Sequence, residues 1–137
     1  MKFLAPLPRG ATTPDSLAGE EVFRAVGCAT CHVPTLMTGT NPNPLFDRQP
    51  VPLFSDLLLH DIGTGDGIRQ ADGEPEEIRT PALWGLRFRR PLLHDGSAAT
   101  IEEALQKHDR EARQTMDRLR GVSPTALAEL MAFLHSL

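Results

Sequence analysis

Large aromatic side chains are scarce in this sequence. Its 137 residues include one Trp, six Phe and no Tyr, so aromatic residues make up 5% of the chain although hydrophobic residues make up 40%. A chain of this length suits a single domain that buries roughly two thirds of its unfolded surface. Because few large flat side chains are available to fill that core, we expect a bulky apolar cofactor to fill part of it.

Clustered positive charge and long apolar runs are also missing. The net charge is -4 and no run of lysines occurs, which argues against a nucleic-acid partner. No apolar stretch approaches the roughly 20 residues that a membrane span needs. Prolines interrupt residues 1–10 before a signal-type apolar region can form, so we expect any export signal to lie on a longer parent chain or to have been removed.

Strand-like alternation is absent over any useful length, and the sequence predicts helices joined by loops. Residues 5–14 carry three prolines and are predicted to be a linker. A first helix is expected after a cap at Ser16, with an apolar stripe from Leu17 to Val26 and a stop at Gly27. Residues 33–54 and 61–79 are predicted to be irregular loops.

Two further features concern these loops and the second half of the chain. Residues 55–60 are expected to form a short helical turn, and the acids of the 61–79 loop lack the register of an EF-hand, which disfavours calcium.

A capping box at 100–103 predicts a second helix, whose register turns His108 toward the core. Ala112, Met116 and Leu119 mark a further amphipathic stretch. A cap and proline at 123–124 predict a helix that runs to the C-terminus.

Both cysteines lie in one short motif, Cys28-Ala29-Thr30-Cys31-His32. A zinc site would need two more ligands, and no pair of the five histidines has finger spacing. A redox dithiol usually accompanies strands that alternate with helices, which this chain lacks. Two buried cysteines that meet by chance are a further reading. Covalent haem explains the spacing most directly, since two thiols bind the two vinyl groups and the next residue offers an imidazole to the iron.

Longer stretches around this motif resemble a known family. The segment "GEEVFRAVGCATCHVPTL" and the C-terminal "LAELMAFLHSL" are similar to the cytochrome c fold, in which a helix with Gly and Phe, here Gly19 and Phe23, crosses the last helix. "SDLLLHDIGTG", "RTPALWGL" and "LLHDGSAATIEEAL" resemble the C-terminal haem domain of the di-haem oxidoreductases, also called thiol oxidoreductase-like, which are related to bacterial di-haem cytochrome c peroxidases. The likeness covers residues 3–137.

This resemblance implies an all-α, cytochrome c-type domain with long irregular loops around one covalent haem c. Residues 1–14, which include the linker-like "FLAPLPRG", would join a missing N-terminal haem domain to a haem domain at 15–137. Cys28, Cys31 and His32 would hold the haem. In the related peroxidases a methionine binds the other face of the iron shortly after a "TLEEA"-like stretch, and that position falls on His108 here.

Other candidate residues follow from the motifs and their chemistry. Met116 is the alternative second ligand, because thioether ligation is common in electron-carrying cytochromes. Met37 is only five residues past His32 and is rejected on reach. His94 and His60 are expected to support the site without binding iron. Trp84 is a candidate for packing on the haem edge, and Arg87 with Arg89 and Arg90 for pairing with haem propionates or docking a redox partner.

The resulting prediction is an electron-transfer domain whose partner is a second haem domain or a small redox protein. A strong second ligand leaves no open iron position, so the domain is not expected to be catalytic alone, although its parent would be an oxidoreductase. A histidine in place of methionine should also lower the reduction potential. Two alternatives stay open: a haem peroxidase with an open iron position, and a binding or assembly module whose haem is structural. Because thioether attachment is normally made outside the cytoplasm, we expect a periplasmic or otherwise exported protein.

Overall fold

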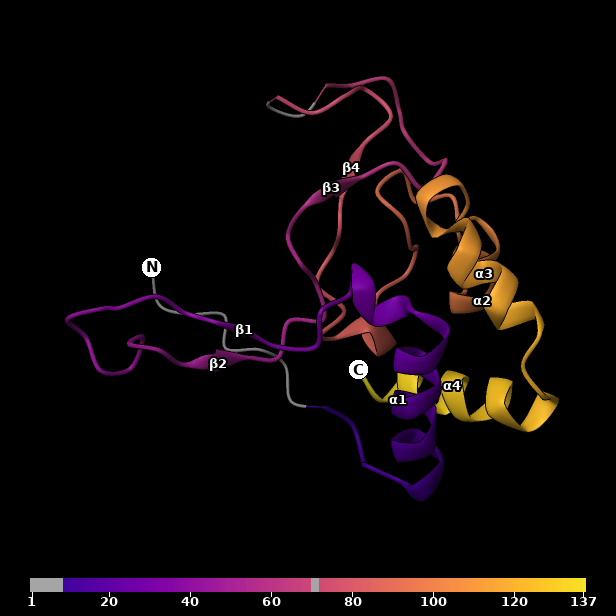
Figure 1. Ribbon diagram of the computed structural model, residues 1–137, viewed down its shortest axis with the longest axis horizontal. Helices are drawn as coiled ribbons and strands as arrows, with labels where there is room; N and C mark the ends of the chain where they lie inside the picture. Colours follow the sequence, from indigo (N-terminus) through magenta and orange to yellow (C-terminus); the bar gives the residue numbers. More distant parts are fainter. Residues whose placement is uncertain (1–8, 70–71) are drawn as a thin grey trace.

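Four α-helices and three short 3-10 helices are connected by long loops in the computed structural model, which describes residues 9–69 and 72–137. The helices are α1 (Pro14–Val26), α2 (Ile101–Gln106), α3 (Arg113–Arg120) and α4 (Pro124–Ser136). The 3-10 helices are η1 (Cys28–Thr30), η2 (Leu86–Phe88) and η3 (Arg110–Ala112). The first and last helices cross each other in close contact, and α2 and α3 follow each other beside the loops of the middle of the chain (Figure 1).

Helix α1 begins two residues earlier than its predicted cap. The Thr13 side chain accepts a hydrogen bond from the Ser16 amide at 3.1 Å, and the Ser16 hydroxyl oxygen accepts one from the Thr13 amide at 2.9 Å. Pro14 fills the first helical position, where its missing N–H costs nothing. Ser16 is therefore the third residue of the helix and not its cap, and Leu17 is exposed. The predicted stop is confirmed, because Gly27 adopts a left-handed conformation at φ 104°.

The core lies where α1 crosses α4. A Cβ atom on Gly19 would fall 1.9 Å from the carbonyl oxygen of Glu129, so only glycine permits this close approach. One turn further along, Phe23 packs against Phe133 with ring centroids 5.2 Å apart, and both side chains are almost fully buried. The crossing of an N-terminal helix that carries Gly and Phe over the last helix is thus confirmed.

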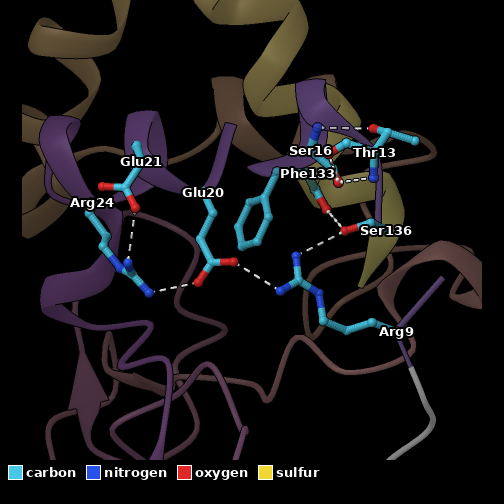
Figure 2. Close-up of polar contacts among 8 residues, drawn as sticks. All are labelled: Arg9, Thr13, Ser16, Glu20, Glu21, Arg24, Phe133 and Ser136. Atoms are coloured by element: carbon cyan, nitrogen blue, oxygen red, sulfur yellow. Dashed lines mark hydrogen bonds and ion pairs between the residues drawn. The ribbon is translucent and has the colours of Figure 1, made fainter. Parts of the chain in front are cut away.

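Arg9 connects the segment before α1 to the end of α4 through hydrogen bonds and an ion pair. Its guanidinium lies between Glu20 and Ser136, at 2.9 Å from the Glu20 carboxylate and 3.3 Å from the Ser136 hydroxyl (Figure 2). The same group lies 5.1 Å from the centroid of the Phe133 ring. The Gly10 amide also donates to the Ser136 carbonyl at 2.7 Å. Residues 9 and 10, in the predicted linker, are therefore bonded to the body, while residues 1–8 of that linker lie outside the described residues.

The expectation of an all-α fold is wrong, because the structure mixes helices with two small antiparallel sheets. Strand β1 (Leu36–Met37) pairs with β2 (Pro50–Val51), and β3 (Leu59–His60) pairs with β4 (Ile78–Arg79). The β1–β2 hairpin extends away from the helices as an arm (Figure 1). Each ladder is two residues long, too short for alternating hydrophobicity to reveal it in the sequence.

The segment predicted as a helical turn at 55–60 is not helical and ends in β3. The buried Ser55 hydroxyl donates to the Thr80 carbonyl at 2.7 Å and accepts from the Leu57 amide, and the Thr80 amide donates to Leu58. Leu57 has a positive φ of 64°, which breaks any helical run there. Tertiary pairing with the 78–80 segment therefore replaces the local helical bonds that the sequence predicted.

The predicted second helix and C-terminal helix are confirmed in position. Thr100 caps α2 by accepting from the Glu103 amide, and Ser123 caps α4 by accepting from the Ala126 amide. Helix α2 ends at Gln106, so His108 lies just past the helix whose register predicted its inward orientation. In α3, Met116 and Leu119 are buried as predicted.

Candidate functional site

A cavity of about 400 Å³ lies between η1, the 60–64 loop and the α2–α3 segment. Pockets of roughly 300 to 1,000 Å³ are the usual size for small-molecule and cofactor sites. Its walls are mostly apolar, and both cysteines with His32, His60, His94 and His108 also reach it. The apolar lining includes Phe23, Leu83, Leu86, Leu92, Leu93, Ile101, Ala104, Leu105, Met116 and Leu134.

The two thiols are brought to the cavity by the turn that follows α1. Gly27 ends the helix in a left-handed conformation, and η1 then returns the chain so that the amides of Cys31 and His32 both donate to the Cys28 carbonyl. Both cysteines are free. Burial raises the pKa of Cys28 to about 11, and burial together with the charges of Asp56 and Glu111 raises that of Cys31. Reactive dithiols have lowered thiol pKa values, so this environment disfavours a redox dithiol.

The imidazole of His32 is oriented by the backbone on the other side of the core. Its Nδ1 lies 3.0 Å from the Phe54 carbonyl oxygen and donates to it, which leaves Nε2 as the nitrogen available to the cavity. Burial lowers the pKa of His32 to about 4, although the bond to Phe54 opposes this shift. The ring is therefore neutral at physiological pH, as a metal ligand must be.

His108 reaches the cavity with the same local arrangement. Its Nδ1 donates to the Ala104 carbonyl at 2.7 Å, so Nε2 is again the available nitrogen. Burial lowers the pKa of His108 although the bond to Ala104 opposes this shift. The proximity of His108 also contributes to the lowered pKa of His32. The structure thus brings together two thiols and two neutral imidazoles of matched tautomer. Donor sets of this kind, in an apolar cavity, fit a covalently held haem.

A polar cluster lies at the edge of the same cavity. His60 Nε2 is 2.8 Å from an Asp56 carboxylate oxygen, and its Nδ1 is 2.9 Å from a Glu111 carboxylate oxygen. Burial alone would lower the pKa of His60, but the two carboxylates raise it above the usual value. Burial likewise opposes ionisation of Asp56, whose pKa is nevertheless lowered by hydrogen bonds from His60 and the Leu58 amide.

This cluster bears on the zinc alternative. Among residues 9–69 and 72–137, Cys31, Asp56 and His60 form the group close enough to share a metal ion. A structural zinc site needs four ligands, and both nitrogens of His60 already face carboxylates. The cluster therefore suits a set of hydrogen bonds better than it suits zinc.

The remaining predicted residues divide between the cavity and its surroundings. His94 lines the cavity, with its Nε2 3.6 Å from Asp66, and Met116 lines it as a buried residue. Trp84 and Arg87 are absent from the cavity lining formed by the described part of the chain. Arg87 instead donates to the carbonyls of Ser136 and Leu137 and lies over the Phe88 ring.

The cavity residues that sequence reasoning did not single out as haem-site candidates include Arg79, Arg118, Gln114 and Glu111. A guanidinium can pair with carboxylates such as haem propionates, and Arg89 of the predicted basic group also lies in the lining. Arg79 belongs to a strand that the sequence did not reveal. Glu111 is three residues after His108 and lies in η3, beyond a non-helical turn that the sequence did not reveal.

Comparison with known proteins gives a family match over nearly the whole chain. Residues 2–137 match the family described as "Di-haem oxidoreductase, putative peroxidase". The chain belongs to the di-haem oxidoreductase family. Among curated members of known name, it is 24% identical over 132 residues to cytochrome c551 peroxidase of Nitrosomonas europaea and 25% identical over 154 residues to the methylamine utilization protein MauG of Methylorubrum extorquens.

Two solved structures share the fold of this di-haem oxidoreductase chain. A chain of Kuenenia stuttgartiensis hydrazine synthase is 23% identical and superposes with a TM-score of 0.64, with 100% of this chain and 51% of that chain covered. A MauG-like protein associated with microbial copper homeostasis is 19% identical with a TM-score of 0.56, with 93% and 45% covered.

The two alignments include 94% and 97% of this chain. They span only 36% and 39% of the length of the two curated relatives. The chain therefore corresponds to a little over a third of each of these two relatives. Of the helices in the described residues, none combines the length and the apolar character needed to cross a bilayer.

Proposed function

We propose that this chain is a haem c-binding electron-transfer domain, the C-terminal part of a periplasmic di-haem oxidoreductase. The observation that carries the proposal is the matched arrangement of His32 and His108. Each imidazole is neutral, donates from Nδ1 to a backbone carbonyl and has Nε2 available to one apolar cavity. Membership of a di-haem family supports haem as the group that these nitrogens bind.

The roles of the residues follow from their chemistry. Cys28 and Cys31 would hold the haem by adding their thiols across its two vinyl groups, each sulfur bonding one vinyl carbon and each proton going to the other carbon. His32 and His108 would hold the iron through Nε2, and Met116 is the runner-up for the second ligand. When bound, the haem supplies one-electron chemistry by alternating between ferric and ferrous iron. Met116 and Leu105 help to exclude water from the cavity.

Electron transfer is favoured over peroxidase chemistry because two neutral imidazoles, those of His32 and His108, reach the one cavity. If both bound the iron, peroxide would have no open position at this haem, and the peroxidase reaction would belong to a second haem on another domain. Residues 1–14 would then be the linker to that domain and residues 15–137 the haem domain. Two imidazoles also favour a lower reduction potential than a His/Met pair.

The proposed location outside the cytoplasm depends on the haem attachment. Thioether bonds to haem are normally made after export, so a chain that carries one is expected in the periplasm or beyond it. The partner of the domain is a second haem domain or a small redox protein. The proposal includes one haem per chain, since both cysteines are used by one motif.

Low-temperature electron paramagnetic resonance of the ferric protein tests the proposal. We expect a low-spin signal in the unmodified protein and a high-spin signal in His108→Ala. His94→Ala is the matched control, because His94 lines the same cavity without the proposed ligand role, and it should stay low-spin. A high-spin signal in the unmodified protein would instead mean an open iron position and would favour a peroxidase.

A redox titration adds an independent measurement. A midpoint potential in the range typical of His/Met haems would contradict His108 ligation and favour Met116. The Met116→Leu variant separates these cases, since it preserves apolar volume but removes the thioether. The signal of this variant should stay low-spin if His108 is the ligand.

A further inference from the structure

His60 lies between two carboxylates that come from different parts of the cavity edge. Its Nε2 lies 2.8 Å from Asp56 Oδ2 and its Nδ1 lies 2.9 Å from Glu111 Oε2. A carboxylate oxygen only accepts, so both ring nitrogens must donate and the ring is an imidazolium. The side chains of His60 and Asp56 are only 18% and 12% exposed, which limits competition from water.

Asp56, the first of the two carboxylates bonded to His60, is also hydrogen-bonded to the motif that holds the thiols. The Asp56 amide donates to the Cys31 carbonyl at 2.8 Å, and the neighbouring Ser55 amide donates to Val33 at 3.0 Å. Asp56 is therefore fixed against the chain immediately around His32. A displacement of Asp56 would be transmitted to that stretch of backbone.

Glu111, the second carboxylate bonded to His60, belongs to the segment that carries His108. Glu111 is three residues after His108, and its second carboxylate oxygen accepts from the Asp61 amide at 2.9 Å. The Glu111 amide donates in turn to the Asp61 carbonyl at 3.1 Å, and the Asp109 amide donates to Ile62 at 3.0 Å. Residues 60–62 and 109–111 are thus joined by reciprocal hydrogen bonds.

The backbone between His108 and Glu111 depends on these bonds for its shape. Arg110 has a positive φ of 49°, a conformation that costs a non-glycine residue of order 1 kcal/mol or more. Its guanidinium pairs with the Asp61 carboxylate at 2.9 Å, on the same loop that carries His60. Hydrogen bonds from residues 60–62 therefore stabilise the turn after α2, and this turn determines where the His108 side chain points.

We propose that His60 is a positioning residue, whose bridge from Asp56 to Glu111 fixes the segment of His108 relative to the segment of His32. The inference rests on the proposed function, since the spacing of these two imidazoles matters only if both bind one iron. His60 itself is not a ligand, because both of its nitrogens are taken by carboxylates. Its effect on the iron is exerted through Glu111 and the backbone up to His108.

Two variants of the haem-loaded protein test this role. His60→Gln keeps a side chain of similar length, but both of its N–H donors are on one nitrogen, whereas the imidazolium donates to the two carboxylates from two separate nitrogens. Glu111→Gln replaces one of the two carboxylate oxygens with an NH2 donor, so it cannot accept from the His60 imidazolium and from the Asp61 amide through separate oxygens as Glu111 does. The second variant changes a side chain that is 50% exposed and should leave the fold intact. Asp117→Asn is the control, because it removes an exposed ion pair on α3 that does not touch the bridge.

The readouts are the ferric spin state and the affinity for cyanide, which must displace the second ligand to bind. We expect a high-spin fraction in His60→Gln and Glu111→Gln and cyanide binding tighter by about tenfold, in line with the usual effect of removing a residue that orients a metal ligand. Asp117→Asn should match the unmodified protein in both measurements. Far-UV circular dichroism and haem content identify any variant that has failed to fold, and Glu111→Gln then carries the test.

The outcomes separate this inference from the proposed function. A low-spin unmodified protein with low-spin variants of unchanged cyanide affinity would overturn the positioning role and leave His108 ligation standing. A high-spin unmodified protein would overturn both. A low-spin protein that becomes partly high-spin only in the His60 and Glu111 variants supports both.

Discussion

Replacement of Gly19 by alanine is the sharpest test of the helix crossing beneath the cavity. The added methyl would lie 1.9 Å from the Glu129 carbonyl oxygen and 2.8 Å from Phe133 Cβ, whereas real Cβ atoms essentially never approach within 3.0 Å. Relief requires α1 and α4 to separate by about 1 Å, because a backbone carbonyl inside a helix cannot rotate away. The separation would loosen the packing of Phe23 against Phe133.

The expected cost follows from two opposing effects. Overpacking of a close contact costs about 3 kcal/mol at the upper end of the usual range. Alanine gains about 1 kcal/mol over glycine in helix propensity, because it loses less backbone entropy on folding. We therefore expect Gly19→Ala to lower the free energy of unfolding by about 2 kcal/mol, which for a domain of this size lowers the Tm by roughly 8 °C.

Guanidinium unfolding followed by far-UV circular dichroism measures this change. Gly39→Ala is the matched control, since a Cβ atom there meets nothing within 4 Å, and its unfolding midpoint should barely move. Equal midpoints for Gly19→Ala and the unmodified protein would refute the close crossing. A loss of stability in both variants would show that the effect comes from the glycine substitution itself and not from the crossing.

Three further outcomes are expected. Cys31→Ser should still retain haem after acid–acetone extraction, through the remaining thioether of Cys28, whereas the double serine variant should release it. Leu130→Ala should lower the free energy of unfolding by about 2–5 kcal/mol in denaturant titrations, because Leu130 is fully buried, and Leu127→Ala, at a residue 42% exposed, should change it far less. The raised pKa of His60 means that its contribution to stability is complete below pH 6.5 and is lost as the pH rises through the folded value, so urea unfolding from pH 6 to 9 should show a decline that His60→Gln lacks.

The sequence predicted best those features that local chemistry determines. Gly27 ends α1, Thr100 and Ser123 cap their helices, and the spacing of Cys28, Cys31 and His32 places all three at one cavity. Each of these signals is contained within a few residues of the chain. His108 does line the same cavity, but the helical register that predicted this was extended two residues past the true end of α2.

Features that depend on pairing between distant segments were missed. Two-residue strands such as β3 have no pattern of their own, and the partner of Leu59 is Arg79, twenty residues away. The same pairing removed the helical turn predicted at 55–60. Arg87 stood beside aromatic and basic neighbours in sequence, but the carbonyls of the last two residues hold it away from the cavity lining of the described chain.

The crossing of α1 with α4 also determines when the domain can fold. These helices are the first and last of the described chain, so their contact closes a loop of about a hundred residues, at an entropic cost that grows with the logarithm of that length. Until Phe133 has been synthesised, Phe23 lacks the ring whose centroid lies 5.2 Å from its own in the folded domain. The cysteine motif beside α1 is therefore part of an unfolded chain until the last helix can pack, and in a chain exported unfolded both thiols would still be accessible for the proposed haem attachment before the cavity forms.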